Sequence, residues 1–184
     1  MTNVTGGNVL IDPQIVITKA QIGERMLVGD LGCGRTGHFI FPIAAAVGEY
    51  GTVYAVDILK DVLTNIEHRA QQENIKQIKT VWSNLEMFKA TKVESSSLDV
   101  ALLINILFQS DKRSEIIREA VRLLKRGGKL LVIDWKKIAV PFGPSIEERI
   151  NKENLIAVCQ RLGLELLEEF NAGEYHFGMV FLKH

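Results

Sequence analysis

A short glycine-rich segment holds the residue types and spacing that could do chemistry. Gly32, Gly34 and Gly37 form a G-x-G-x-x-G pattern, and Asp57 follows the last glycine by 20 residues. Glycines let backbone N–H groups approach a ligand closely, and a carboxylate at this spacing can bind two ribose hydroxyls. The pattern predicts a site for an adenosine-containing cofactor; the alternative is a tight strand-to-helix turn that binds nothing.

The residue two positions before the first glycine favours one kind of cofactor over another. Asp30 places a carboxylate where it would repel a pyrophosphate and attract an ammonium group. A dehydrogenase normally adds a second catalytic lobe, and a chain of 184 residues leaves no length for one. These observations favour a cofactor that carries an ammonium group, and a nicotinamide dinucleotide stays as the alternative.

Strand-like and helix-like segments alternate along the chain, which predicts a parallel sheet covered by helices on both faces. Residues 98–104 are an apolar run interrupted only by Asp99, as expected of a central strand. The other expected elements are strands over 26–31, 52–56, 78–83 and 129–134, helices over 37–47, 59–72, 114–125 and 153–162, a loop over 85–97 and a connection over 137–149.

The C-terminal part of the chain has a different pattern. Residues 164–170 and 175–182 are expected to form an antiparallel hairpin around the turn at 171–173. Together with the five earlier strands this predicts a mostly parallel sheet of seven strands. We expect a single α/β domain over residues 1–184, with residues 1–11 flexible because the TGGN segment has nothing to pack against.

Composition excludes several classes of protein. Apolar residues make up 47% and charged residues 24%, which is typical of a globular domain and not of a disordered chain. Lys plus Arg and Asp plus Glu both number 22, so no net charge favours nucleic acid. Cys33 and Cys159 are too few for a disulfide framework or a four-cysteine zinc site. The absence of a targeting or membrane-spanning pattern predicts a cytoplasmic protein.

At this point several motifs, in order, resemble class I S-adenosylmethionine-dependent methyltransferases. The segments DLGCGRTG, VYAVDI, SNLE, LDVALLINILF and LLKRGGKLLVID are similar to successive motifs of that family, over roughly residues 12–183. The resemblance is strongest to small-molecule enzymes of the ubiquinone and menaquinone biosynthesis type and their minimal relatives. It implies a Rossmann-like, doubly wound fold, with S-adenosylmethionine as cofactor and no metal.

The resemblance also implies roles in cofactor binding. Asp30 would hold the methionine ammonium, Asp57 the ribose hydroxyls, and Ile58 and Leu85 would flank the adenine. Asn84 would lie at the adenine edge, where the family usually has an aspartate. The full set of implied cofactor-binding residues is Asp30, Gly32, Cys33, Gly34, Gly37, Asp57, Ile58, Asn84, Leu85 and Asn105.

Residues on the acceptor side follow from the fold. Ligands of such sheets lie beyond the carboxyl ends of the strands. Methyl transfer by in-line displacement needs alignment and exclusion of water, so no catalytic side chain is assigned. An ordinary packing role is the alternative for each acceptor-side candidate, and these are Phe108, Gln109, Asp134, Trp135, Tyr175 and His176.

The sequence therefore predicts a minimal methyltransferase that acts on a small molecule. The turn after residues 98–104 lacks the Pro-Pro-aromatic pattern of enzymes that methylate bases, so no nucleic-acid partner is expected. The chain also lacks a large inserted lid, which a homodimer could supply. Two other functions stay open: a non-catalytic S-adenosylmethionine-binding module or subunit, and an NAD-binding oxidoreductase.

Overall fold

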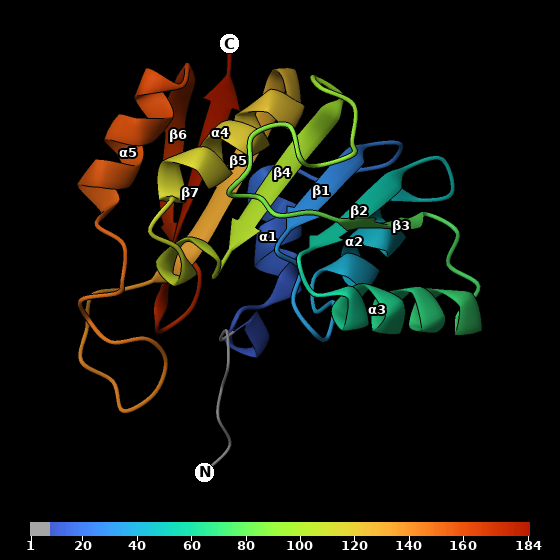
Figure 1. Ribbon diagram of the computed structural model, residues 1–184, viewed down its shortest axis with the longest axis horizontal. Helices are drawn as coiled ribbons and strands as arrows, with labels where there is room; N and C mark the ends of the chain where they lie inside the picture. Colours follow the sequence, from blue (N-terminus) through green and yellow to red (C-terminus); the bar gives the residue numbers. More distant parts are fainter. Residues whose placement is uncertain (1–7) are drawn as a thin grey trace.

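A seven-stranded sheet forms the middle layer of the molecule (Figure 1). The computed structural model describes residues 8–184. The strand order is β3-β2-β1-β4-β5-β7-β6; the first five strands are parallel, and β7 runs antiparallel to β5 and β6. The predicted fold with its C-terminal hairpin is thereby confirmed. The strands are β1 (Leu27–Leu31), β2 (Thr52–Asp57), β3 (Ile78–Trp82), β4 (Leu98–Ile104), β5 (Leu124–Trp135), β6 (Leu164–Asn171) and β7 (His176–Lys183).

Helices cover both faces of the sheet. Within the described residues, α1, α2 and α3 contribute to the hydrophobic core on one face, and α4 and α5 to the core on the other. No helix of residues 8–184 is long and apolar enough to cross a membrane. The helices are α1 (Pro13–Ala20), α2 (Ile40–Val47), α3 (Lys60–Gln72), α4 (Arg113–Leu123) and α5 (Lys152–Arg161), and two 3-10 turns are η1 (Asn8–Leu10) and η2 (Leu107–Gln109).

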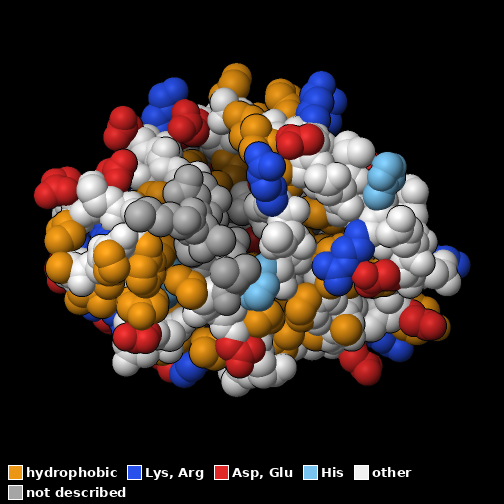
Figure 2. Space-filling model, turned by 90° about the horizontal axis from the view of Figure 1, so that it is seen from below, with side chains coloured by type: hydrophobic (Ala, Val, Ile, Leu, Met, Phe, Trp, Pro, Cys, Tyr) orange, Lys and Arg blue, Asp and Glu red, His pale blue; other side chains and the backbone are white. Residues whose placement is uncertain are grey.

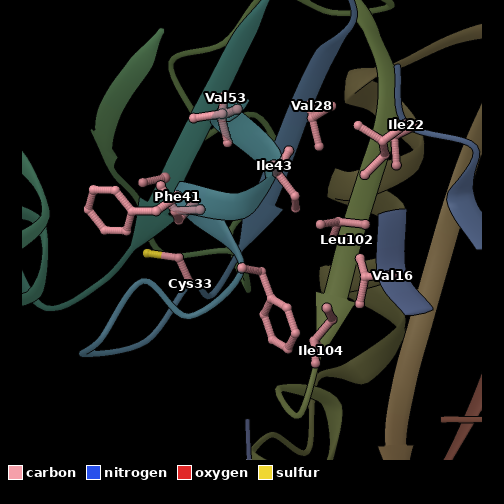
Figure 3. Close-up of a cluster of buried hydrophobic side chains, with 14 of the residues drawn as sticks. Val16, Ile22, Val28, Cys33, Phe41, Ile43, Val53, Leu102 and Ile104 are labelled. Carbon is pink, nitrogen blue, oxygen red and sulfur yellow. The ribbon is translucent and has the colours of Figure 1, made fainter. Parts of the chain in front are cut away.

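The first core shows how the strands are buried. Figure 3 shows Val28 of β1 and Leu102 and Ile104 of β4 meeting Val16 of α1 and Ile43 of α2. The alternate residues of β4, including Ala101 and Leu103, enter the second core. Because both faces are covered, most residues of the central strands β1 and β4 are apolar, as the pattern of residues 98–104 predicted.

The N-terminal part differs from expectation. Helix α1 was not predicted, although Asp12 caps it through a 2.8 Å bond from the Gln14 N–H and Pro13 stands at its first position. Of the segment expected to be flexible, residues 1–7 lie outside the described part of the chain. Asn8–Leu10 form η1, and Ile11 is buried in the first core.

Two helix boundaries also differ. The helix expected over 37–47 begins only at Ile40, because Gly37 has a φ of 56°, outside the helical region. The helix expected over 114–125 ends at Leu123, and Leu124 already pairs with Leu98 in the sheet. The cationic residues after position 124 therefore belong to β5 and not to a helix terminus.

Candidate functional site

The carboxyl ends of the five parallel strands meet at one edge of the sheet, together with the start of β7. In Figure 1 this edge is at the bottom, and Figure 2 views the molecule from that side. Sixteen residues were predicted from the sequence to lie at or near this edge.

The glycine loop follows β1 directly. Gly32, Gly34 and Gly37 have φ angles of 89°, 69° and 56°, a region that favours glycine. A Cβ at Gly32 would lie 2.1 Å from the Cδ1 of Ile106, so the loop packs closely against the residues that follow β4. The N–H groups of Gly32 and Cys33 donate to the Val56 carbonyl at 2.8 and 3.1 Å, which anchors the loop to β2.

Asp57, at the end of β2, braces this loop. Its Oδ2 accepts a 3.0 Å hydrogen bond from the Gly34 N–H, and its Oδ1 accepts one of 3.0 Å from the Leu59 N–H. Each carboxylate oxygen keeps further acceptor capacity. Asp57 is thus a structural residue of the loop and still has lone pairs to offer a ligand.

Asp30 is buried beneath the loop. Its side chain is only 1% exposed, and Oδ2 has no hydrogen-bond partner within the described part of the chain. Burial, with a smaller contribution from the charge of Asp57, raises the pKa of Asp30 to about 7. A nearby cation would stabilise the ionised form of such a buried carboxylate that lacks a hydrogen-bond partner.

Asn105 lies beyond the end of β4 and turns the chain sharply. Its φ is 54°, and its backbone N–H donates to the Ile133 carbonyl at 2.9 Å. The side-chain Nδ2 donates to the Oδ1 of Asn8 at 3.0 Å. A Cβ at Gly34 would lie 3.6 Å from the Nδ2 of Asn8, so the side chain of Asn8 contacts both the glycine loop and Asn105. Sequence analysis missed Asn8, which lies in the segment expected to be flexible.

The loops after β2 and β3 hold the residues expected near adenine. Ile58 is 51% exposed and free to contact a ligand, whereas Leu85 is buried in the second core. Asn84 uses its Oδ1 to accept a 3.0 Å bond from the Glu86 N–H. Trp82, which sequence analysis missed, is exposed and donates from Nε1 to the Ile58 carbonyl at 2.8 Å. Trp82 could have been found from the sequence, because it is an aromatic residue at the end of a predicted strand.

Asp134 holds η2 against the end of β5. Its Oδ1 accepts from the Trp135 N–H at 2.8 Å and its Oδ2 from the Phe108 N–H at 3.3 Å. Burial raises the pKa of Asp134 to about 7, although these bonds and Arg113 oppose the change. Gln109 donates to the Asn105 carbonyl at 2.6 Å. These contacts give Asp134 and Gln109 structural roles at the edge.

Trp135 and His176 form a fully buried aromatic pair. They face each other across β5 and β7, with ring centroids 4.4 Å apart. Phe142, from the connection after β5, packs edge-on against Trp135 at 6.1 Å and against Tyr175 at 4.9 Å. Burial, followed by the charges of Lys136 and Arg149, lowers the pKa of His176 to about 4, so its ring is neutral at pH 7.

The two cysteine thiols are buried and unreactive. Burial, with the charges of Asp30 and Asp57, raises the pKa of Cys33, and burial raises that of Cys159 to about 12. The thiolate is the nucleophilic form, so neither group is suited to attack. Within residues 8–184, no group of three or more His, Cys, Asp or Glu side chains could hold a metal ion.

The model of a family described as a methyltransferase domain matches residues 22–170. The chain belongs to this methyltransferase family.

Curated relatives and solved structures agree with the family. The chain is 28% identical over 112 residues to demethylmenaquinone methyltransferase of Lactococcus lactis subsp. lactis (strain IL1403), covering 61% of this chain and 43% of that protein. It is 28% identical over 109 residues to arsenite methyltransferase of Aquipseudomonas alcaligenes, covering 57% of this chain and 31% of that protein. The chain spans less than half the length of these curated relatives.

Among solved structures, the fold matches a SAM-dependent methyltransferase from Aquifex aeolicus with a TM-score of 0.84 and 22% identity. That match covers 99% of this chain and 95% of the other. The family match confirms the predicted methyltransferase family, and the structural match confirms the predicted fold.

Proposed function

We propose that this protein is a single-domain S-adenosylmethionine-dependent methyltransferase that methylates a small-molecule acceptor by in-line displacement. The observation that supports it is the buried Asp30 carboxylate with an unpartnered oxygen, next to a glycine loop braced by Asp57. When bound, the cofactor supplies a methyl group on a positively charged sulfur. The residues present fit such a cofactor at both its ends.

At the methionine end, Asp30 would pair with the ammonium group. A desolvated carboxylate is strongly stabilised by a cation and strongly destabilised by a second anion. A pyrophosphate at this place would add negative charge beside Asp30, whose pKa is already raised by burial and by the charge of Asp57. This favours S-adenosylmethionine over NAD. Asn105, with its unpartnered Oδ1, would be the second group at this end.

At the adenosine end, Asp57 would accept hydrogen bonds from the ribose hydroxyls with its remaining lone pairs. The exposed Ile58 would pack against the adenine, and Asn84 would accept from the adenine amine with the second lone pair of its Oδ1. Leu85 would act from the core by holding this loop in place. The loop residues Gly32, Cys33, Gly34 and Gly37 would line the cradle between the two ends.

The acceptor would approach from the part of the edge formed by β5 and β7, because the proposed cofactor residues stand at the ends of β1, β2, β3 and β4. Alignment of the acceptor and exclusion of water would supply most of the rate acceleration. We propose a cytoplasmic protein whose partner is a small molecule, and a homodimer would cover the edge further.

A calorimetric titration tests the proposal. Wild-type protein, Asp57→Asn and the exposed control Asp61→Asn are each titrated with S-adenosylmethionine, S-adenosylhomocysteine and NAD. We expect both sulfur compounds to bind the wild type and the control, and Asp57→Asn to lose at least tenfold in affinity, about 1.4 kcal/mol. Binding of NAD alone would overturn the proposal.

The two other functions give different results. A non-catalytic module would bind S-adenosylmethionine and form no S-adenosylhomocysteine with any member of an acceptor panel. A methyltransferase forms S-adenosylhomocysteine in proportion to the methylated acceptor. Failure of all three ligands to bind would contradict both the enzyme and the binding module.

A further inference from the structure

The buried side-chain polar atoms without a hydrogen-bond partner, within residues 8–184, are all at one edge of the sheet. They are Asp30 Oδ2, Asn105 Oδ1, Trp135 Nε1 and both ring nitrogens of His176. Their strands, β1, β4, β5 and β7, are neighbours in that order. Buried polar groups are nearly always paired, so an unpaired set in one place calls for a ligand. The cofactor proposal uses only Asp30 and Asn105.

The remaining atoms belong to one compact pair. Trp135 and His176 are register partners in the antiparallel β5–β7 ladder, so their side chains stand on the same face. Their rings are 4.4 Å apart and inclined by 47°. Three nitrogens therefore belong to a pair of side chains that is fully buried, where each unmade hydrogen bond is costly.

This pair adjoins the proposed methionine end. The Asn105 N–H is bonded to the carbonyl of Ile133, two residues before Trp135 on the neighbouring strand. Adjacent strands are about 4.8 Å apart, so Asn105 and Trp135 are near neighbours. In methionine only a short aliphatic chain separates the ammonium group from the sulfur. An acceptor held by Trp135 and His176 would therefore be close to the transferred methyl group.

The connection between β5 and α5 covers the pair. A Cβ at Gly143 would lie 2.7 Å from Trp135 Cη2, so the glycine rests directly on the indole. The buried Arg149 guanidinium braces this cover by donating to the carbonyls of Pro144 at 3.0 and 2.9 Å and of Lys136 at 2.8 Å. Hydrophobic side chains gather at the left of Figure 2, where this connection lies, and Ile138 and Ile146 are exposed. Beside the cover, a pocket of about 530 Å³ is lined by Trp135, Lys136 and Phe177, among others.

We propose that Trp135 and His176 form the acceptor subsite, and that this subsite takes a planar aromatic acceptor through a hydroxyl group. The inference rests on the proposed methyltransferase function. A hydroxyl is one donor and two acceptors, so it donates to the lone pair of a His176 nitrogen while accepting from the Trp135 N–H. An aromatic ring attached to that hydroxyl packs against the indole and Phe142. The acceptor enters when residues 137–149 move aside.

The charges around the pair select against amines. Lys136 and Arg149 are the cations that act on the His176 ring. Among residues 8–184 neither forms a salt bridge, and both donate to backbone carbonyls. A protonated amine would add a third positive charge, with the sulfonium as a fourth. A phenolic hydroxyl is neutral, and its ionisation is favoured by these same charges.

The test measures binding of three small probes to the protein saturated with S-adenosylhomocysteine. Phenol, anisole and benzylamine have one ring and differ in the group offered to the subsite. Binding constants come from calorimetry and from NMR of the ring protons of the four histidines. The variants are His176→Phe and Trp135→Phe, which keep a flat ring, and the control is His68→Phe on the exposed face of α3.

We expect phenol to shift the His176 signal and to bind at least tenfold more tightly than anisole or benzylamine. In both subsite variants the ratio of phenol affinity to anisole or benzylamine affinity should fall at least tenfold. In His68→Phe this ratio should stay unchanged. The subsite is wrong if the wild type binds S-adenosylhomocysteine but not phenol. It is also wrong if His176→Phe and Trp135→Phe bind phenol with the affinity of the wild type. In both cases the proposed function stands. If S-adenosylhomocysteine itself fails to bind the wild type, the proposed function fails first. Binding of S-adenosylhomocysteine by each variant shows that it is folded.

Discussion

At the scale of single residues, Asp30 and Asp57 have opposite environments although both lie at the glycine loop. Asp57 accepts two backbone hydrogen bonds, and these hold the loop in the conformation that its glycines allow. Asp30 is buried and leaves one oxygen unpaired, which costs stability in the free protein. Stability given up at a site is commonly recovered when the ligand binds.

Replacement of Asp30 should reveal this cost. The pKa of Asp30 is raised from 3.8 to about 7, so the native state keeps the proton to higher pH than the unfolded chain. The free energy of unfolding therefore falls as pH rises from about 4 to about 7. At pH 8 we expect Asp30→Asn to increase the free energy of unfolding by roughly 2–4 kcal/mol and so to raise the melting temperature. At pH 4 the melting temperature should change little.

Asp134→Asn is the matched control for thermal unfolding. Asp134 is equally buried and has a similar pKa of about 7, but both of its oxygens accept backbone hydrogen bonds. An amide would turn an NH₂ group toward one backbone donor, so at pH 8 this variant should gain less stability than Asp30→Asn does. A loss of stability in Asp30→Asn at pH 8 would contradict the assignment of an unpaired carboxylate.

Ligand affinity should also depend on pH through Asp30. An ammonium group binds the ionised carboxylate, so below pH 7 binding must first remove a proton from Asp30. We expect the affinity for S-adenosylhomocysteine to fall up to about tenfold per pH unit between pH 7 and pH 5.5, as measured by calorimetry. In Asp30→Asn the affinity should be lower and nearly independent of pH over this range. A wild-type affinity that is also flat would show that Asp30 is not ionised in the complex.

At the scale of elements, α4 holds the loop that joins β3 to β4. Glu119 is buried and accepts from the N–H groups of Lys89 at 2.8 Å and Thr91 at 3.0 Å. It also pairs with Arg122, which donates further to the Thr91 carbonyl. Burial alone would raise the pKa of Glu119, but these partners outweigh it and lower the pKa to about 2. A segment with no regular structure is thereby fixed, and Asn84 and Leu85 stand at its start.

Removal of the Glu119 charge should loosen this loop. We expect Glu119→Gln to lower the free energy of unfolding by roughly 2–3 kcal/mol at pH 7, because charged hydrogen bonds to buried groups are lost. The wild-type advantage should be complete above pH 4.5 and decrease as pH falls toward 2, since the folded pKa is lowered. Denaturant titration measures it. Glu115→Gln, on the exposed side of α4, is the control and should change stability by less than about 0.5 kcal/mol.

At the scale of the whole molecule, helices bury the two faces of the sheet, and the proposed ligand site lies at its carboxyl edge. Two separate cores bury the faces under α1, α2 and α3 on one side and α4 and α5 on the other. The unpaired polar groups collect at the carboxyl edge. This division lets a ligand stabilise the native state without any rearrangement of the cores.

Thermal unfolding should report this stabilisation. S-adenosylhomocysteine at 100 times its dissociation constant adds about 2.7 kcal/mol, because it binds only the native state. For a chain of this length we expect the melting temperature to rise by roughly 5–10 °C. The same concentration of NAD should cause no rise. A rise with NAD alone would support the dinucleotide alternative.

Much of the fold could be predicted because its signals are local. The apolar run of β4 and the helical period of α3 depend on neighbouring residues only, and both elements agree with their predicted bounds to within one residue. The end of α4 could not be predicted in the same way. Its last carbonyls accept from the N–H groups of Ser96 and Ser97 at 2.9 Å, and these residues precede the helix by more than a dozen positions.

For the site, the sequence by itself determined the glycine loop, Asp57 and the family, because glycine spacing and motif order are properties of the chain. Only the tertiary structure decided which polar groups are left without partners. Asp30, Trp135 and His176 could be named as candidates from their type and position, but whether their polar atoms find partners depends on burial by segments that are distant in the chain. Hydrogen-bond pairing is a property of contacts, and contacts between distant segments are set by packing.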